Sequence, residues 1–115
     1  MESAEKNNWM GCPADLEVAI VFLPTEHGGR KGSAFSGYRP QFYYDGADWD
    51  ALQSYPDQSE VRPGEAARAY LYFLSPEPHE GRLWPGKPFL IREGQRTVGY
   101  GVVRRVLNSR LQGVA

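Results

Sequence analysis

The chain has 115 residues, which is enough for one domain with a buried core but too few for two independent domains. Its 13 basic and 14 acidic residues give a formal net charge of -1, so no global field attracts nucleic acid or an anionic membrane, and contact with either requires a local patch. The 13 glycines, 9 prolines and 13% share of aromatic residues favour short strands and tight turns over helices.

Residues 1–15 show no hydrophobic periodicity, and we expect them to form a flexible N-terminal tail. They contain neither the basic region nor the apolar run of a signal peptide, and no stretch of the chain is apolar for long enough to cross a bilayer. Cys12 is the sole cysteine and has no partner for an internal disulfide. These features predict a protein of a reducing, cytoplasm-like compartment, without a membrane partner.

The first expected strand covers residues 16–23, LEVAIVFL. Both of its faces are largely apolar, which is typical of a central strand that is covered on both sides. Residues 24–37 follow, with the adjacent cations Arg30 and Lys31 among four glycines: Gly28, Gly29, Gly32 and Gly37. This composition predicts a long exposed loop, and long loops in compact domains often carry function.

A hairpin is expected next. Residues 38–44, YRPQFYY, form its first strand, and Pro40 limits this strand to an edge, an end or a bulge because proline has no N–H to donate. Asp45 and Gly46 are a strong turn signal. The returning strand is expected over residues 49–55, although its alternation is weak.

Residues 56–65 form a polar loop that ends in Arg-Pro-Gly-Glu, a sequence that fits a type II turn because proline fixes one turn angle and glycine accepts the positive one. Residues 67–74 alternate with period two and predict the next strand. Residues 75–87 are rich in proline and glycine, so we expect another loop there.

The segment 89–106 carries the clearest pattern and predicts a second hairpin, which turns at Glu93-Gly94-Gln95. We expect Val98, Tyr100 and Val102 on one face of its long strand. Gly99 and Gly101 then lie on the other face, where the missing side chains let a second strand or a barrel corner come close.

A helix over residues 102–111 is the rival interpretation, because Val102, Val106 and Leu107 also fit helical spacing. Glycine and β-branched residues beside this segment disfavour it. Strand then follows strand with no amphipathic helix between them. The sequence therefore predicts an all-β fold, a closed or nearly closed antiparallel barrel over residues 16–108, with residues 109–115 as a C-terminal tail.

Sequence motifs for catalysis or cofactor binding are weak. The spacing of Gly81, Gly86 and Lys87 nearly matches a phosphate-binding loop. However, Pro88 replaces the Ser or Thr that holds magnesium, and a strand follows where the motif requires a helix, so we expect no bound nucleotide. Three residues are conceivable nucleophiles without a nearby base or elbow motif: Cys12, Ser33 and Ser36. We expect no enzymatic activity.

His27 and His79 stand in separate loops, without a second ligand at metal-binding spacing. We therefore expect two solvated histidines and no metal or other cofactor. Arg30 and Lys31 can in the same way be interpreted as solvated loop charges without a binding role.

Two longer motifs are more specific. One is His27-Gly28-Gly29-Arg30 followed by residues 37–43, GYRPQFY, and the other is IREGQRTVG over residues 91–99 followed by GVV over 101–103. In order and spacing they resemble the C-terminal (third) domain of bacterial elongation factor Tu over residues 17–107. The resemblance implies a six-stranded antiparallel closed β-barrel of the translation-factor third-domain type.

In that family the third domain has no chemistry of its own; it packs against the GTPase domain, holds the T-stem backbone of aminoacyl-tRNA and meets the nucleotide-exchange factor. The resemblance implies that Arg30, Gln41, Glu93 and Gly94 stand at RNA-facing positions. With the neighbouring cations Lys31 and Arg39 they form the expected binding site for RNA or a partner protein. We expect a stand-alone third domain that lacks the GTPase and middle domains and binds tRNA or a protein of the translation machinery, but not DNA.

Two positions depart from the family pattern. Asp45 stands where the family has arginine, and Asp50 where it has threonine. A carboxylate that faces phosphate repels it by about 1 kcal/mol. These acids and the surplus of tyrosines favour an alternative, a protein-interaction module that mimics the elongation factor Tu domain and either competes for its ligands or protects the factor against an agent that targets it. A fragment with no activity of its own is a third possibility.

Overall fold

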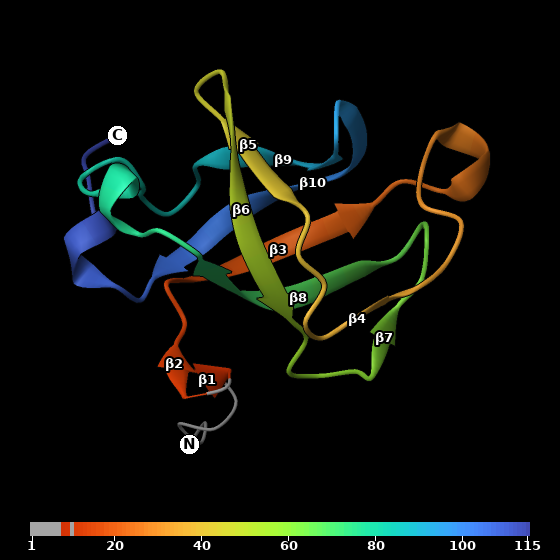
Figure 1. Ribbon diagram of the computed structural model, residues 1–115, viewed down its shortest axis with the longest axis horizontal. Coiled ribbons are helices and arrows are strands. Elements are labelled where there is room, and N and C mark those ends of the chain that lie inside the picture. The colour runs from red at the N-terminus through yellow and green to blue at the C-terminus, as the bar shows by residue number, and fades with distance from the viewer. Residues whose placement is uncertain (1–7, 10) are drawn as a thin grey trace.

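The computed structural model describes residues 8–9 and 11–115 and shows a closed barrel in which every pair of neighbouring strands is antiparallel (Figure 1). The strand order around the barrel is β10-β3-β8-β6-β5-β9. The barrel strands are β3 (Leu16–Phe22), β5 (Gln41–Tyr44), β6 (Ala47–Ser54), β8 (Ala66–Phe73), β9 (Pro88–Glu93) and β10 (Arg96–Val106). The predicted six-stranded antiparallel barrel is confirmed, and the rival helix over residues 102–111 is wrong, because β10 runs to Val106.

Smaller elements lie in the connections. Two short sheets pair β1 (Asn8–Trp9) with β2 (Cys12–Pro13) and β4 (Ala34–Phe35) with β7 (Glu60–Val61). Within the described residues, η2 (Thr25–His27), η3 (Glu77–His79) and η4 (Ser109–Leu111) are single turns of 3₁₀-helix. No helix of the described part of the chain has the length and apolar character needed to span a membrane.

Strand β3 pairs with β10 on one side and with β8 on the other, as every strand of a closed barrel pairs with two neighbours, so β3 is no more central than the other barrel strands. Its alternate residues fill the barrel interior, each at most 1% exposed: Leu16, Val18, Ile20 and Phe22. Across the barrel, the ring of Phe42 stacks on Phe89 with a centroid distance of 4.2 Å and meets Phe73 edge-on at 5.2 Å. Such offset and edge contacts are the geometries that aromatic rings prefer.

The hairpin of β5 and β6 differs from the expected one at both ends. Strand β5 begins at Gln41 rather than at residue 38, because Pro40 has no N–H and contributes only its carbonyl, which accepts from Ala51 N at 3.3 Å. Strand β6 begins two residues earlier than expected. Asp45 (φ 50°) and Gly46 (φ 83°) both adopt positive φ, so a two-residue turn closes the hairpin directly.

Strand β10 approaches its neighbours closely at two glycines. A Cβ at Gly101 would lie 2.6 Å from Ala19 O and 2.7 Å from the Phe89 ring, and one at Gly99 would lie 2.7 Å from Val21 O. The expectation that these glycines allow close approach is therefore confirmed.

The prediction that Val98 shares a face of the strand with Tyr100 and Val102 is wrong. A β-bulge between Thr97 and Gly99 shifts the register, so Val98 turns into the core while Tyr100 and Val102 stay on the outer face. A bulge adds one residue to the strand and breaks strict alternation. The sequence pattern alone does not show where this happens.

The barrel contacts residues that the sequence analysis assigned to the tails. Asp15 is buried; its carboxylate accepts from Phe73 N at 2.8 Å and from Asn108 Nδ2 at 2.9 Å, and its carbonyl accepts from Leu107 N at 2.9 Å. Leu111 is also fully buried. The segments before β3 and after β10 are thus held together by Asp15, through its carboxylate and its backbone carbonyl.

His79 is not solvated as expected. It is 1% exposed, its ring stacks on Phe73 with a centroid distance of 3.8 Å, and Tyr44 OH lies 2.6 Å from its Nδ1. Burial, with the nearby charge of Arg82, lowers the pKa of His79 to about 4. The aromatic neighbours come from β5, β6 and β8, which is why the sequence around His79 gave no sign of burial.

Candidate functional site

The loop after β3 folds back on itself and presents Arg30. Pro24 O accepts from both His27 N and Gly29 N at 2.9 Å, and Thr25 Oγ1 donates to Arg30 O at 2.5 Å. A Cβ at Gly29 would overlap Leu23 O at 1.9 Å, so only glycine fits there. The glycine-rich composition of this loop thus serves a defined conformation.

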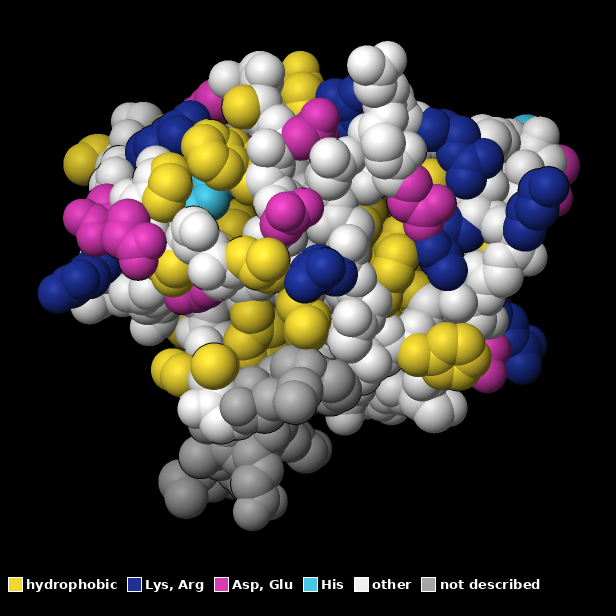
Figure 2. Space-filling view, in the orientation of Figure 1, with side chains coloured by type: hydrophobic (Ala, Val, Ile, Leu, Met, Phe, Trp, Pro, Cys, Tyr) yellow, Lys and Arg dark blue, Asp and Glu magenta, His cyan; other side chains and the backbone are white. Residues whose placement is uncertain are grey.

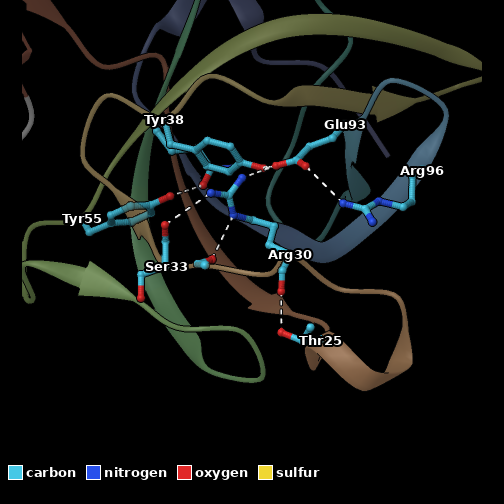
Figure 3. Close-up of polar contacts among 9 residues, drawn as sticks. Thr25, Arg30, Ser33, Tyr38, Tyr55, Glu93 and Arg96 are labelled. Atoms are coloured by element: carbon cyan, nitrogen blue, oxygen red, sulfur yellow. Dashed lines mark hydrogen bonds and ion pairs between the residues drawn. The ribbon is translucent and has the colours of Figure 1, made fainter.

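Arg30, Tyr38, Glu93 and Arg96 form the Arg30–Glu93 network, in which the first three side chains point toward one another (Figure 3). Arg30 makes an ion pair with Glu93, and its guanidinium lies 4.2 Å from the centroid of the Tyr38 ring. Tyr38 OH donates to the same carboxylate oxygen, and Arg96 Nη2 lies 3.4 Å from the other. The network joins the loop after β3 to the β9–β10 turn.

The pKa shifts in this network fit a charged, mutually satisfied cluster. Burial opposes the charges of Arg30 and Glu93, but Tyr38 and the ion pair outweigh it: the pKa of Arg30 is raised and that of Glu93 is lowered from their usual values. Burial and the hydrogen bond to Glu93 raise the pKa of Tyr38. Both partners of the ion pair therefore stay ionised at neutral pH.

Because Arg30 and Glu93 neutralise each other, the net charge at this end of the barrel comes from their neighbours. Lys31 and Arg39 are exposed and have no ion-pair partner within residues 8–9 and 11–115. The side chain of Arg96 is 53% exposed. Figure 2 shows Lys and Arg side chains gathered at the right of the view, over this loop and the β9–β10 turn, with acidic side chains among them.

Gln41 lies on the outer wall beside this end. Its Cα partner across β5 and β9 is Arg92, the residue before Glu93, and across β5 and β6 it is Asp50. Arg92 stacks on Tyr43 at 4.6 Å. In the described part of the chain, Gln41 Oε1 and Arg92 Nε are buried without a hydrogen-bond partner.

The structure thus brings the predicted site residues to one end of the barrel in two groups. Arg30, Lys31, Glu93 and Gly94 lie at the loop and the turn, and Gln41 lies on the adjoining wall, one strand from the turn. Gly94 takes φ 61° at the exposed tip of the turn. Arg39 follows Tyr38 in the chain and is exposed.

Asp45, expected to repel phosphate, is neutralised within the molecule. Lys87 Nζ lies 3.0 Å and Arg82 Nη2 3.5 Å from its Oδ2. The hydrogen bond from Lys87, with the charge of both cations, lowers the pKa of Asp45. Asp50, the other departure, is exposed opposite Gln41, so its charge remains at the wall.

Two of the three conceivable nucleophiles, Ser33 and Ser36, are hydrogen-bonded to other residues of the chain. Ser33 Oγ donates to Glu60 at 2.6 Å, Ser36 Oγ accepts from Tyr55 N at 2.9 Å, and Cys12 is exposed and free. No cluster of three His, Cys, Asp or Glu able to hold a metal ion occurs among the described residues.

Sequence reasoning missed three contributors to the site: Tyr38, Arg92 and Arg96. Tyr38 carries the π face for Arg30 and a hydroxyl for Glu93, whereas the sequence analysis placed it only at the start of a strand. Arg92 and Arg96 stand on either side of the turn Glu93-Gly94-Gln95. A basic residue on each side of an exposed turn was the available signal.

One comparison with known protein families bears on this site. Residues 13–107 match the family model described as the elongation factor Tu C-terminal domain. The matched segment includes every strand of the barrel, the glycine-rich loop and the β9–β10 turn.

Proposed function

The chain belongs to the elongation factor Tu C-terminal domain family, and from this premise we propose that it is a non-catalytic binding module of translation that holds the backbone of tRNA at the Arg30–Glu93 end of the barrel. One observation supports this most: Arg30 and Glu93, 63 residues apart in sequence, are locked together beside exposed cations. The module acts in the cytoplasm and requires no cofactor.

Each part has a distinct task in this proposal. The ion pair fixes the loop and the turn relative to each other, while Lys31, Arg39 and Arg96 supply the positive charge that phosphates need. The exposed backbone of Gly94 lets a ribose or phosphate come close without a side chain in the way. Such contacts hold an RNA backbone by charge and shape and do not read its sequence.

A salt series tests this function. We expect labelled aminoacyl-tRNA to bind at about 50 mM salt, with an affinity that falls steeply as salt rises because phosphate contacts release counterions. Lys31→Ala and Arg39→Ala should each weaken binding and lower the slope of log K against log salt by about 1. Arg30→Ala should also weaken binding, because the loop then loses its anchor.

Arg110→Ala is the matched control. Arg110 is 80% exposed in its side chain and lies in the segment near the C-terminus, on the far side of the barrel from the loop after β3 in Figure 1. It should bind as the wild type does. Absence of binding at low salt, or an equal loss in Arg110→Ala and Lys31→Ala, would contradict the proposal.

A second candidate function is a protein-interaction module, and one feature favours it. The outer face of β3, β8 and β10 carries an apolar groove between the exposed side chains of Tyr100 and Val102 and the Ala66–Ala67 edge, flanked by Arg68 and Arg104. We expect purified elongation factor Tu or its exchange factor to be captured by the wild type and not by Ala66→Glu. Equal capture by the wild type and by Ala66→Glu would exclude this groove as the contact.

A further inference from the structure

A second pocket, of about 550 Å³, lies away from the Arg30–Glu93 network, none of whose four residues lines it. Its walls come from the end of β5, the loop before β9 and the outer face of β10. The apolar and aromatic part of the lining includes Tyr43, Trp84, Leu90, Tyr100 and Val102. Both its size and its largely apolar walls are typical of sites for small molecules.

The polar end of this pocket is the ammonium group of Lys87. The side chain is only 10% exposed, and Nζ lies 4.1 Å from the centroid of the Trp84 ring. Within the described residues its acceptor is Asp45 Oδ2, at 3.0 Å. An ammonium group carries three donors, so two remain for a ligand that enters the pocket.

The charges at this end do not cancel. Asp45 is shared between Lys87 and Arg82, which lies 3.5 Å away, so two cations face one carboxylate. The balance favours an anion and disfavours a cation. The aromatic rings of Trp84 and Tyr100 in the lining offer flat surfaces for a planar group.

We propose that this pocket binds a small organic anion in which a planar apolar group carries a carboxylate. The carboxylate accepts hydrogen bonds from Lys87 Nζ, and the planar group lies against Trp84 and Tyr100. Lys87 and Trp84 come from the loop over residues 82–87, so this loop creates the site. The inference does not depend on RNA binding, because the two sites share no residue.

Three probes of one shape test the charge preference: 2-naphthylacetate, 2-naphthylacetamide and 2-(2-naphthyl)ethylamine. Binding is followed by ¹H–¹⁵N NMR through the indole N–H of Trp84, which Trp84→Phe assigns. We expect the carboxylate to bind at least about tenfold more tightly than the amide, as one charge-assisted hydrogen bond allows, and the amine to bind most weakly.

Variants assign the preference to Lys87. Lys87→Met should bring the carboxylate within about threefold of the amide while amide binding changes by less than about twofold, because only the ionic contact is lost. Arg104→Met, a cation of the neighbouring groove, should keep the full preference. Tyr100→Ala should weaken all three probes alike. If Lys87→Met does not give a folded spectrum, Arg82→Met replaces it and should reduce the preference by lowering the positive balance.

Two results would overturn the inference. One is equal binding of the three probes, or none; the other is a carboxylate preference that survives in Lys87→Met. The peptide acetyl-Gly-Gly-Phe with a free carboxylate separates a small molecule from a chain terminus. Binding of this peptide about tenfold more tightly than 2-naphthylacetate would assign the pocket to a polypeptide C-terminus and also reject a small-molecule ligand.

Discussion

Glu93 is the residue on which the candidate RNA site depends. Its carboxylate accepts from Arg30 and Tyr38 through one oxygen and faces Arg96 through the other. One side chain thus satisfies donors from the loop after β3, the segment before β5 and the start of β10. Its removal would leave the Arg30 guanidinium on the Tyr38 ring without a counter-charge.

Replacement of this carboxylate has a predicted pH signature. The pKa of Glu93 lies below its usual 4.5, so the folded state binds its proton less readily than the unfolded state. Its stabilisation is therefore complete above about pH 5 and is lost as the pH falls through the lowered pKa. We expect Glu93→Gln to be less stable than wild type by about 1 kcal/mol at pH 7, since partial exposure screens the pair. Urea unfolding should show this gap narrowing as the pH falls below about 5, and parallel curves would contradict it.

Because His79 is buried, we predict a second loss of folding stability, at a pH closer to neutral. Its pKa falls from 6.5 to about 4 on folding, so below pH 6.5 the unfolded state takes up the proton first and stability declines as pH falls. Between pH 7 and pH 5 the wild type should lose about 1 to 2 kcal/mol through this residue. His79→Gln should lack this loss, whereas His27→Gln, which changes an exposed histidine, should retain it. An equal loss in both variants would show that His79 is not the source.

At the scale of elements, β10 packs closely against β3 and Phe89 at Gly101. Gly101 leaves no room for a methyl group between Ala19 O and Phe89, so Gly101→Ala should cost about 1 to 3 kcal/mol in urea unfolding. Gly32 has open space around it and no positive φ, and Gly32→Ala should stay within about 0.5 kcal/mol of wild type. A neutral Gly101→Ala would mean that the strands can separate there.

The elements that the sequence predicts well are those with local causes. The apolar alternation of β3 and the Asp45-Gly46 turn are set by neighbouring residues, and both occur where expected. The β-bulge beside Val98 arises in the pairing of β10 with the adjacent β9, and the alternation of residues along the strand does not mark it. The short β4–β7 pair joins segments distant in sequence, so no local pattern marks it. For the same reason the burial of His79 was missed.

The candidate site likewise has features that the sequence predicts and features that depend on the fold. The motif residues Arg30 and Glu93 do meet, but the sequence does not show that they neutralise each other and leave the exposed charge to Lys31 and Arg96. Nor does it show that Asp45 is neutralised. Its partners Arg82 and Lys87 lie 37 and 42 residues away and reach it only through the path of the loop before β9.

Although its net charge is nearly neutral, the molecule has a cationic surface at one barrel end and an apolar surface on the outer face of β10. Each barrel strand is paired on both sides, so none of the six offers a free edge for strand addition. Recognition is left to the loops at the barrel ends and to the outer faces of the strands. The Arg30–Glu93 end is rich in cations, and the outer face of β10 exposes Tyr100 and Val102.

The most direct test of the central claim is a ¹H–¹⁵N NMR map of the full chain titrated with aminoacyl-tRNA at low salt. We predict that the perturbed amides cluster in residues 28–33, 38–41 and 92–97, which meet at the Arg30–Glu93 end. Perturbations centred on Tyr100 and Val102, or none at all, would contradict the claim that this end of the barrel holds RNA.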